Sequence, residues 1–437
     1  MIINECNDEM KLWNGLPAIL IEDNGEKNWA FFTKIDNGIV VGKFPEKDFY
    51  SKKQYEKAKE NGAFNCYLNR QTSMNNTMKV VLCLTEKCNC RCRYCFLDAE
   101  NVGISMSTKV LHKAIDKAIE ITGNRHLIIT AFGGEPGIEE GLLKEMVTYT
   151  RKQVAASPVK SCNFSISTNG IIDDNVIDIL RENKFKINIS MDGTQEVQDF
   201  QRPLANGEAT YHLVENTIKK LAKEDINDIK VRCTVTQFSV DKMPSIVENM
   251  ARLPVGQVHF EPVTPGGRGA NDDSRLQPPS AHDFVKYLKK SIEIGEKLDV
   301  DVLASSYMKL QDAPAAFCDG NINNKLVVST EGNLSTCVEV QSKSHKLFDC
   351  FSVGYYDTKL NDFVLKYKNR RECGNVCSQT IREACSNCPL NFYCAGWCPT
   401  RNYRGSGHTG VVDKYYCEIV KEMLPYVLKK IYKATYC

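Results

Sequence analysis

The sequence predicts an α/β fold: a partial (β/α)6 TIM-like barrel, preceded by a small N-terminal α+β domain and followed by a C-terminal cysteine-rich domain. Three observations support this. In the middle of the chain, short apolar runs alternate six times with amphipathic helical patterns. The length of 437 residues suits two or three domains at about 150 residues each. The 20 cysteines are uneven, with one group at 83–95 and another spread over 318–417.

Residues 1–76 are expected to form the first domain. Strand-like segments lie at 17–22, 28–34 and 38–43, and the tripeptide Asp-Asn-Gly, a strong turn signal, lies between successive segments. A charged stretch at 46–61 has a helical pattern. We therefore expect a small unit with both strands and a helix.

Residues 77–305 are expected to form the barrel. The strand-like runs lie at 79–84, 126–131, 162–168, 186–191, 228–236 and 256–262. The helical patterns lie at 107–122, 139–154, 172–183, 211–223, 241–252 and 281–296, and a loop rich in Gly, Pro and Asp lies at 264–280. Short apolar strands that alternate with helices are typical of a covered parallel sheet. Functional side chains should then gather at the carboxyl ends of the strands.

Residues 306–437 are expected to form the third domain. Helical periodicity fades after about residue 306, cysteines become frequent, and an amphipathic helix is expected at 417–433.

Composition excludes several classes of protein. Lys and Arg total 56 and Asp and Glu total 54, a balance that argues against a nucleic-acid-binding surface. No run of 18 apolar residues predicts a membrane span, and the first 20 residues lack the pattern of a signal peptide. We expect a cytoplasmic protein that binds neither nucleic acid nor membrane. In a reducing compartment its cysteines should be metal ligands or redox groups rather than disulfides.

The first metal motif is CNCRCRYC at 88–95. Cys88, Cys92 and Cys95 form C-x3-C-x2-C directly after the first barrel strand. Three thiolates can hold three irons of a [4Fe–4S] cluster and leave the fourth iron open for a substrate or cofactor. A closed zinc site is the alternative, but it needs four ligands and no second pair is near. Cys90 breaks the spacing and is interpreted as a non-ligand.

This loop, followed by the aromatic Phe96, resembles the cluster loop of the radical SAM (S-adenosylmethionine) superfamily. Residues 132–136 read FGGEP, at the end of the second strand. In the family such an element contacts the amino group of the methionine moiety. Gly133 and Gly134 would allow close backbone approach, and Glu135, followed by Pro136, or nearby carbonyls would accept from the ammonium.

Other strand ends carry the same resemblance. It implies ribose and carboxylate contacts at Thr168, Asn169, Ser190, Asp192 and Arg202, and an adenine-contacting edge at 258–262. Taken singly, each glycine could be a plain turn and each Ser or Asp a helix cap. Five strand ends in register make those simpler interpretations improbable together.

The C-terminal cysteines resemble the SPASM extension of radical SAM peptide-modifying enzymes. The pattern is Cys318-x13-Gly332-x4-Cys337, then C-x2-C-x5-C-x3-C, then a last cysteine. The resemblance implies one auxiliary cluster on Cys318, Cys337 and Cys398 and another on Cys385, Cys388, Cys394 and Cys417. The implied cofactors are three [4Fe–4S] clusters and S-adenosylmethionine; structural zinc is the alternative.

Two closed auxiliary clusters need four ligands each, and the seven thiolates of this pattern leave one ligand unassigned. Cys350, Cys373 or Cys377 could supply it, or the first auxiliary cluster has an open iron. The remaining thiols are expected to be buried apolar groups or inert: Cys6, Cys66, Cys83, Cys162, Cys233 and Cys437.

The resemblance implies reductive cleavage of S-adenosylmethionine to a 5′-deoxyadenosyl radical, which takes a hydrogen atom from a ribosomally made precursor peptide. The leading hypothesis is a maturase that installs a thioether or carbon–carbon crosslink, with a flavodoxin- or ferredoxin-type protein as electron donor. The alternative is formylglycine formation of the anaerobic sulfatase type, or another peptide dehydrogenation. Sulfatase maturases place an Asp directly after the cysteine equivalent to Cys337, whereas this chain has Val338 and then Glu339.

Two further points complete the sequence hypothesis. Residues 1–76 resemble part of a winged-helix-like element that binds precursor leaders by strand addition, with a simple structural cap as the alternative. A ferredoxin-like electron carrier is the alternative from a different class, but it would need no S-adenosylmethionine pocket. The sequence assigns no general base, although Glu339, Asp319 and Tyr94 lie near cluster motifs.

Overall fold

The computed structural model divides the chain into two compact units. One comprises Met1–Ser73, Ala304–Phe317 and Cys377–Cys437, and the other comprises Met74–Leu303 and Cys318–Val376. The residues that the structure describes are 5–7, 10–13, 16–23, 26–35, 38–45, 76–100, 102–223, 229–270, 272–312, 318, 320, 324–366, 385, 394, 396–409 and 411–436.

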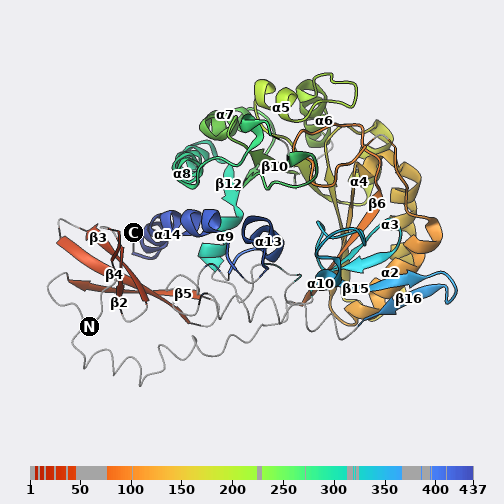
Figure 1. Cartoon of the computed structure of the whole chain (residues 1–437), viewed down its shortest axis with the longest axis horizontal. Coiled ribbons are helices and arrows are strands. Elements are labelled where there is room, and N and C mark those ends of the chain that lie inside the picture. The colour runs from red at the N-terminus through yellow and green to blue at the C-terminus, as the bar shows by residue number, and fades with distance from the viewer. Residues whose placement is uncertain are drawn as a thin grey trace. The chain divides into compact units, whose positions relative to one another are not determined.

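A parallel sheet forms the centre of the larger unit (Figure 1). Its strands are β6 (Thr77–Thr85), β7 (His126–Gly133), β8 (Ser161–Thr168), β9 (Lys186–Ser190), β10 (Ile229–Val235) and β11 (Gln257–Pro262). Each strand pairs in parallel with the next one along the chain. The six predicted strands and the partial-barrel fold class are confirmed.

Helices cover the convex side of this curved sheet (Figure 1). They are α2 (Thr108–Thr122), α3 (Glu140–Ala155), α4 (Asp174–Glu182), α6 (Tyr211–Lys223), α7 (Met243–Ala251) and α8 (Ala281–Leu298). All six correspond to predicted helices. Their starts follow local chemistry, since Ser107 caps α2 and Ser280 caps α8 by accepting from a backbone N–H. The short helix α5 (Gln195–Gln201) was not predicted.

The strands are apolar because one face of each strand is buried under these helices. Side chains from every strand on this face are fully buried: Val80, Leu82, Ile129, Ile166, Ile187, Val231 and Phe260. The opposite, concave face carries most of the polar strand residues, such as Asn188 and His259. Short 3-10 turns complete the connections: η3 (Pro136–Ile138), η4 (Val240–Lys242), η5 (Gly267–Gly269) and η6 (Ser274–Leu276).

The sheet extends beyond the predicted barrel at both edges. β12 (Asp301–Ala304) lies beside β11, and β13 (Lys325–Val328) pairs in parallel with β6. Antiparallel strands β14 (Asn333–Ser335), β15 (Ser352–Asp357) and β16 (Asp362–Leu365) then continue the sheet to eleven strands. Residues 325–365, which the sequence placed with the C-terminal domain, therefore continue the barrel sheet. Gly332, at φ 84°, provides the turn between β13 and β14.

Among its described residues, the smaller unit contains an antiparallel five-stranded sheet and three helices. Its strands pair in chain order: β1 (Glu5–Asn7), β2 (Met10–Trp13), β3 (Leu16–Asp23), β4 (Glu26–Ile35) and β5 (Gly38–Pro45). Its helices are α9 (Ser305–Asp312), α13 (Pro399–Ser406) and α14 (Lys414–Tyr436), and α14 packs against α9. The three predicted strands are present, with two more before them. The predicted helix at 46–61 lies outside the described residues.

No helix among the described residues combines the length and the apolar character needed to cross a membrane.

Candidate active site

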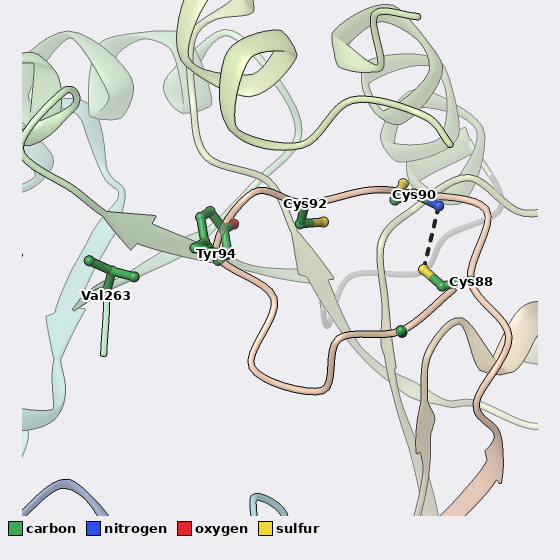
Figure 2. Packing of buried hydrophobic residues seen from close by; sticks show 6 residues of the cluster. Cys88, Cys90, Cys92, Tyr94 and Val263 are labelled. Atoms are coloured by element: carbon green, nitrogen blue, oxygen red, sulfur yellow. Dashed lines mark hydrogen bonds between the residues drawn. The ribbon is translucent and has the colours of Figure 1, made fainter. Parts of the chain in front are cut away.

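Four cysteines lie on the buried loop that follows β6. Cys88 and Cys92 are 7% exposed, Cys90 is 2% exposed, and the half-buried Cys95 packs against them. With Tyr94, Ala99 and Val263 they form one packed cluster, and Figure 2 shows Cys88, Cys90 and Cys92 following one another along the loop. The loop therefore places the three thiols of the C-x3-C-x2-C motif in a water-poor site at the carboxyl end of the sheet.

Segments distant in sequence hold this loop through its backbone. The backbone N–H groups of Arg91 and Arg93 donate to carbonyls of residues 203 and 201 at 2.8 and 2.9 Å. Arg268, in the loop after β11, donates from Nε to the Cys92 carbonyl at 3.1 Å and from its backbone to the Cys95 carbonyl at 3.0 Å. The sequence identified residues 264–280 only as a loop, and the structure shows that it supports the cysteine motif.

The thiols differ in acidity because of their neighbours. A hydrogen bond from the Cys90 thiol lowers the pKa of Cys88 to about 7 and also lowers the pKa of Cys92. Burial raises the pKa of Cys95. Cys88 and Cys92 thus share the Cys90 donor, which favours the thiolate, the form that binds iron, at either of them.

The donor set fits a cubane cluster better than a single ion. Throughout the described part of the chain, no three Cys, His, Asp or Glu side chains converge as one metal ion would require. A [4Fe–4S] cluster binds each thiolate at a different iron, so Cys88, Cys92 and Cys95 suit it. The buried Nε of Arg202 has no hydrogen-bond partner, which is consistent with a polar group that completes the site.

The two glycines of FGGEP allow protein segments to approach closely. A Cβ on Gly133 would lie 2.2 Å from the Thr85 carbonyl oxygen, and one on Gly134 would lie 2.2 Å from that of Lys87. The backbones of Gly134 and Glu135 donate to the same two carbonyls at 2.9 and 2.8 Å. The space that the glycines provide in the structure is therefore occupied by the start of the cysteine loop.

Glu135 is fully buried and joins two strand ends. Its Oε1 accepts from the Gly137 backbone at 2.9 Å and from the Thr168 hydroxyl at 2.8 Å. Its Oε2 accepts from the Asn169 backbone at 2.6 Å. Burial raises the pKa of this carboxyl from 4.5 to about 7, against these hydrogen bonds. The structure thus directs Glu135 toward the end of β8.

Asn169 connects the end of β8 to the cysteine loop. Its Nδ2 donates to the Asn89 side chain at 2.6 Å and to the Cys88 sulfur at 3.7 Å. The neighbouring Thr168 hydroxyl accepts from the Gly170 backbone at 3.0 Å.

Asp192, Tyr94 and Arg202 form a buried network beside the cysteines. The Tyr94 hydroxyl donates to Asp192 Oδ2 at 2.5 Å and accepts from Arg202 Nη1 at 2.7 Å. Asp192 also accepts from the Thr234 backbone at 2.9 Å. Burial raises the pKa of Tyr94 far above its usual range, which makes this phenol unsuitable as a general base.

Sequence reasoning missed two glutamines on α5 that complete this network. Gln201 Nε2 donates to Asp192 Oδ2 at 2.6 Å, and Gln198 Oε1 accepts from the Asp192 backbone at 2.8 Å. Both side chains are buried. The two glutamines lie three residues apart, just before Arg202, and this spacing was the available signal.

The other sequence-predicted residues lie at the same strand ends. Ser190 is the half-buried last residue of β9, and Pro136 is buried at the start of η3. Phe96 is half-buried, and its carbonyl lies next to Gly267. The larger unit thus brings the first-cluster residues and the proposed cofactor-binding residues to one end of its sheet.

The C-terminal cysteines are distributed over both units. In the larger unit, Gly320 lies close to both the Cys318 sulfur and the Thr336 carbonyl, so Cys318 lies near the chain that enters Cys337. Cys350 is a half-buried residue of α10 (Phe348–Phe351). Cys373, Cys377 and Cys388 lie outside the described residues.

In the smaller unit, an aromatic contact joins the C-terminal cysteine segments. Trp397 is 2% exposed and stacks on Tyr416 with ring centroids 4.6 Å apart. Trp397 lies between Cys394 and Cys398, and Tyr416 precedes Cys417 on α14. This stack holds the turn that contains Cys394 and Cys398 against α14, the helix that contains Cys417. Cys385 is half-buried in this unit.

The thiols expected to be inert are described in part. Cys83 and Cys233 are buried, and Cys162 is half-buried. Burial raises the pKa of all three. Cys6 lies in β1, and Cys66 and Cys437 lie outside the described residues.

Comparison with known proteins agrees with this geometry. The family model of the radical SAM superfamily matches residues 82–253. The chain is 24% identical over 380 residues to a cysteine-type anaerobic sulfatase-maturating enzyme of Clostridium novyi, which covers 80% of this chain and 94% of that protein. It is 21% identical over 339 residues to a serine-type anaerobic sulfatase-maturating enzyme of Klebsiella aerogenes, covering 75% and 81%.

Solved structures share the fold. Native anSMEcpe with bound AdoMet superposes with a TM-score of 0.66 at 20% identity, covering 82% of this chain and all of that one. SuiB of Streptococcus suis bound to precursor peptide SuiA superposes with a TM-score of 0.54 at 14% identity, covering 84% and 88%. Residues 82–253 thus resemble the radical SAM superfamily, the chain is similar along most of its length to anaerobic sulfatase-maturating enzymes, and the buried cysteine loop lies within the matched residues.

Proposed function

We propose that this chain is a radical SAM peptide maturase that installs a thioether or carbon–carbon crosslink in a ribosomally made precursor peptide. The observation that carries the proposal is the buried Cys88, Cys92 and Cys95 loop at the strand ends of a partial barrel. Relatives named as sulfatase-maturating enzymes, and a fold shared with SuiB bound to its precursor peptide, support a peptide substrate.

Cys88, Cys92 and Cys95 would hold a [4Fe–4S] cluster, which when bound would supply an open iron and one electron for the reductive cleavage of S-adenosylmethionine. The chain holds the thiols and keeps water from them by burying the loop. The buried Arg202, fixed through Tyr94 and with a free Nε, is suited to bind an anionic group of the cofactor.

Residue 338 favours crosslinking over formylglycine formation. In sulfatase maturases an Asp, a proposed base, occupies the place of Val338. Here Val338 and Phe132 pack against an apolar cluster of Val81, Cys83 and Val327. An apolar side chain cannot take a proton, so aldehyde formation would need another base. The named relatives keep formylglycine formation as the second candidate.

Two auxiliary [4Fe–4S] clusters complete the proposal and make three clusters in all. Cys318, Cys337 and Cys398 would bind one, and Cys385, Cys388, Cys394 and Cys417 would bind the other. Crosslinking removes two hydrogens from the peptide: one leaves as a hydrogen atom to the radical, and the other leaves as a proton and an electron. The auxiliary clusters would accept that electron, and a flavodoxin- or ferredoxin-type protein would supply the first one.

The N-terminal sheet supports a role in precursor binding. The antiparallel sheet of β1–β5 has strand β5, eight residues long, at one edge. An edge strand offers unpaired backbone groups to which a leader peptide can add a strand. We include residues 1–76 in the proposal as the peptide-recognition domain.

The test is anaerobic reconstitution with iron, sulfide, dithionite and S-adenosylmethionine. Formation of 5′-deoxyadenosine is expected, and its absence would refute the enzyme proposal. Peptides encoded next to the gene are then incubated with the protein. A crosslink removes two hydrogens and creates no aldehyde, whereas formylglycine reacts with a hydrazide probe. Hydrazide labelling of the product would replace crosslinking with the second candidate.

A further inference from the structure

One motif cysteine accepts two hydrogen bonds from neutral N–H groups. The Cys88 sulfur accepts from the Cys90 backbone N–H at 3.5 Å and from Asn169 Nδ2 at 3.7 Å. Figure 2 shows the first of these bonds, which closes a tight turn of the loop. Both donors are buried, at 2% and 5% exposure, so water does not compete for the sulfur.

The Asn169 amide is oriented by its other contacts. Its Oδ1 accepts from the Ile171 backbone at 2.9 Å, and its Nδ2 also donates to Asn89 Oδ1 at 2.6 Å. Its own backbone N–H is bound by the buried Glu135 carboxylate at 2.6 Å. With the oxygen side occupied, the nitrogen must face the Cys88 sulfur, and the donor is held in place before any cofactor arrives.

Cys90 is fixed between two motif cysteines. Its backbone forms an antiparallel bridge with Leu204, and its thiol hydrogen-bonds to the sulfurs of Cys88 and Cys92. Its one S–H proton can be donated to only one of these sulfurs at a time, and the residue is 2% exposed. The chain therefore surrounds the Cys88 sulfur with donors from its own loop and from the end of β8.

We propose that Asn169 and Cys90 are positioning residues for Cys88, and that their hydrogen bonds raise the reduction potential of the cluster held by Cys88, Cys92 and Cys95. A reduced cluster carries one more negative charge, part of which resides on its sulfurs. Donors to those sulfurs stabilise the reduced form more than the oxidised form. Cys90 acts in this proposal as a donor and not as a ligand.

This role differs from a contact between Asn169 and S-adenosylmethionine, and it does not depend on which peptide is modified. It acts on the cluster before the cofactor binds. It can therefore be measured without S-adenosylmethionine and without peptide, and its failure leaves the proposed function untouched.

The experiment is a redox titration of the reduced cluster by electron paramagnetic resonance, on protein whose C-terminal cysteines are replaced by alanine so that one cluster gives the signal. Asn169→Ala removes the amide donor, and Cys90→Ala removes the thiol donor while it keeps the backbone N–H. Asn169→Gln and Cys90→Ser retain a side-chain donor. Asn188→Ala and Cys162→Ala make the same chemical changes on β9 and β8, away from the loop. Iron and sulfide are counted in every variant.

Loss of one donor should lower the ratio of reduced to oxidised cluster at a fixed potential about fivefold, the size of one net hydrogen bond. The Gln and Ser variants should recover part of that loss, the two controls should match the parent, and all variants should retain their iron. If the ratio of reduced to oxidised cluster is unchanged in both Asn169→Ala and Cys90→Ala, the proposal is overturned. Loss of iron from Cys90→Ala would do so as well, because it would make Cys90 a ligand.

Discussion

The Tyr94 hydroxyl donates a hydrogen bond to the Asp192 carboxylate with an oxygen–oxygen distance of 2.5 Å, although 98 residues separate them. The bond ties the cysteine loop to the end of β9. Tyr94 is 8% exposed and Asp192 is fully buried, so neither group can replace its partner with water. Arg202, which donates to the same hydroxyl at 2.7 Å, depends on this bond for its place beside the cysteines.

Tyr94→Phe should therefore weaken both the fold and the binding of S-adenosylmethionine. Removal of the hydroxyl leaves a buried carboxylate and a guanidinium each short of one partner, which should lower the free energy of unfolding by about 1–3 kcal/mol. Urea unfolding measures this loss, and equilibrium dialysis should show S-adenosylmethionine binding about three- to tenfold weaker. Tyr149→Phe is the matched control, because Tyr149 also donates to an aspartate, Asp116, at 3.0 Å on the surface of α2 and α3. Equal effects from the two variants would contradict this account.

Glu135 should make the folded protein less stable as the pH rises from about 5 to 7. Its pKa is about 7 in the fold against 4.5 ordinarily, because of burial. The folded state therefore holds the proton more tightly than the unfolded chain does in this interval. The loss is at most about 3 kcal/mol and is complete above pH 7, where both states are ionised.

Glu135→Gln removes this titration and should flatten the dependence of stability on pH between 5 and 7 in cluster-free protein. The amide cannot accept all three hydrogen bonds, so the variant should be less stable overall. Urea unfolding at several pH values gives both quantities. The exposed Glu140→Gln should keep the slope of the parent, and a slope unchanged in Glu135→Gln would count against the assignment.

Trp397→Ala should disrupt the C-terminal cysteine segments. Trp397 is buried and stacked on Tyr416, so its truncation should cost about 3–5 kcal/mol in the smaller unit. We expect iron content to fall while the three-cysteine loop retains its cluster, as read from its electron paramagnetic resonance signal. Trp397→Phe keeps an aromatic ring and should retain most of the iron. Full iron content in Trp397→Ala would show that the stack does not organise those cysteines.

Val338→Asp should not convert the protein into a formylglycine-forming enzyme. The carboxylate would enter an apolar cluster with Val81 and Val327, which should lower the free energy of unfolding by about 1–3 kcal/mol. Val338→Ala controls for the change in packing. Hydrazide labelling of a Cys- or Ser-containing peptide by the Asp variant, but not by the parent, would show that position 338 alone separates the two chemistries.

The features that could be predicted from the sequence are those that depend on short-range patterns of residues. The six barrel strands and the cysteine spacing depend on residues close in the chain, so periodicity and motif spacing were sufficient. The roles of Glu135 and Tyr94 could not be read in this way. The motif predicted that Glu135 or nearby carbonyls accept from an ammonium, and the structure adds that the Glu135 oxygens accept from Gly137, Thr168 and Asn169.

The sequence by itself determined the α/β class, the position of the cysteine loop after the first barrel strand, and the set of strand ends that meet there. Tertiary structure alone decided that residues 325–328 pair with β6, that α5 supplies Gln198 and Gln201, and that Arg202 reaches Tyr94 across 108 residues. The physical reason is that pairing between distant segments depends on buried hydrogen bonds and packing. Those contacts form only when the chain folds, and the hydrophobic periodicity of a short segment does not reveal them.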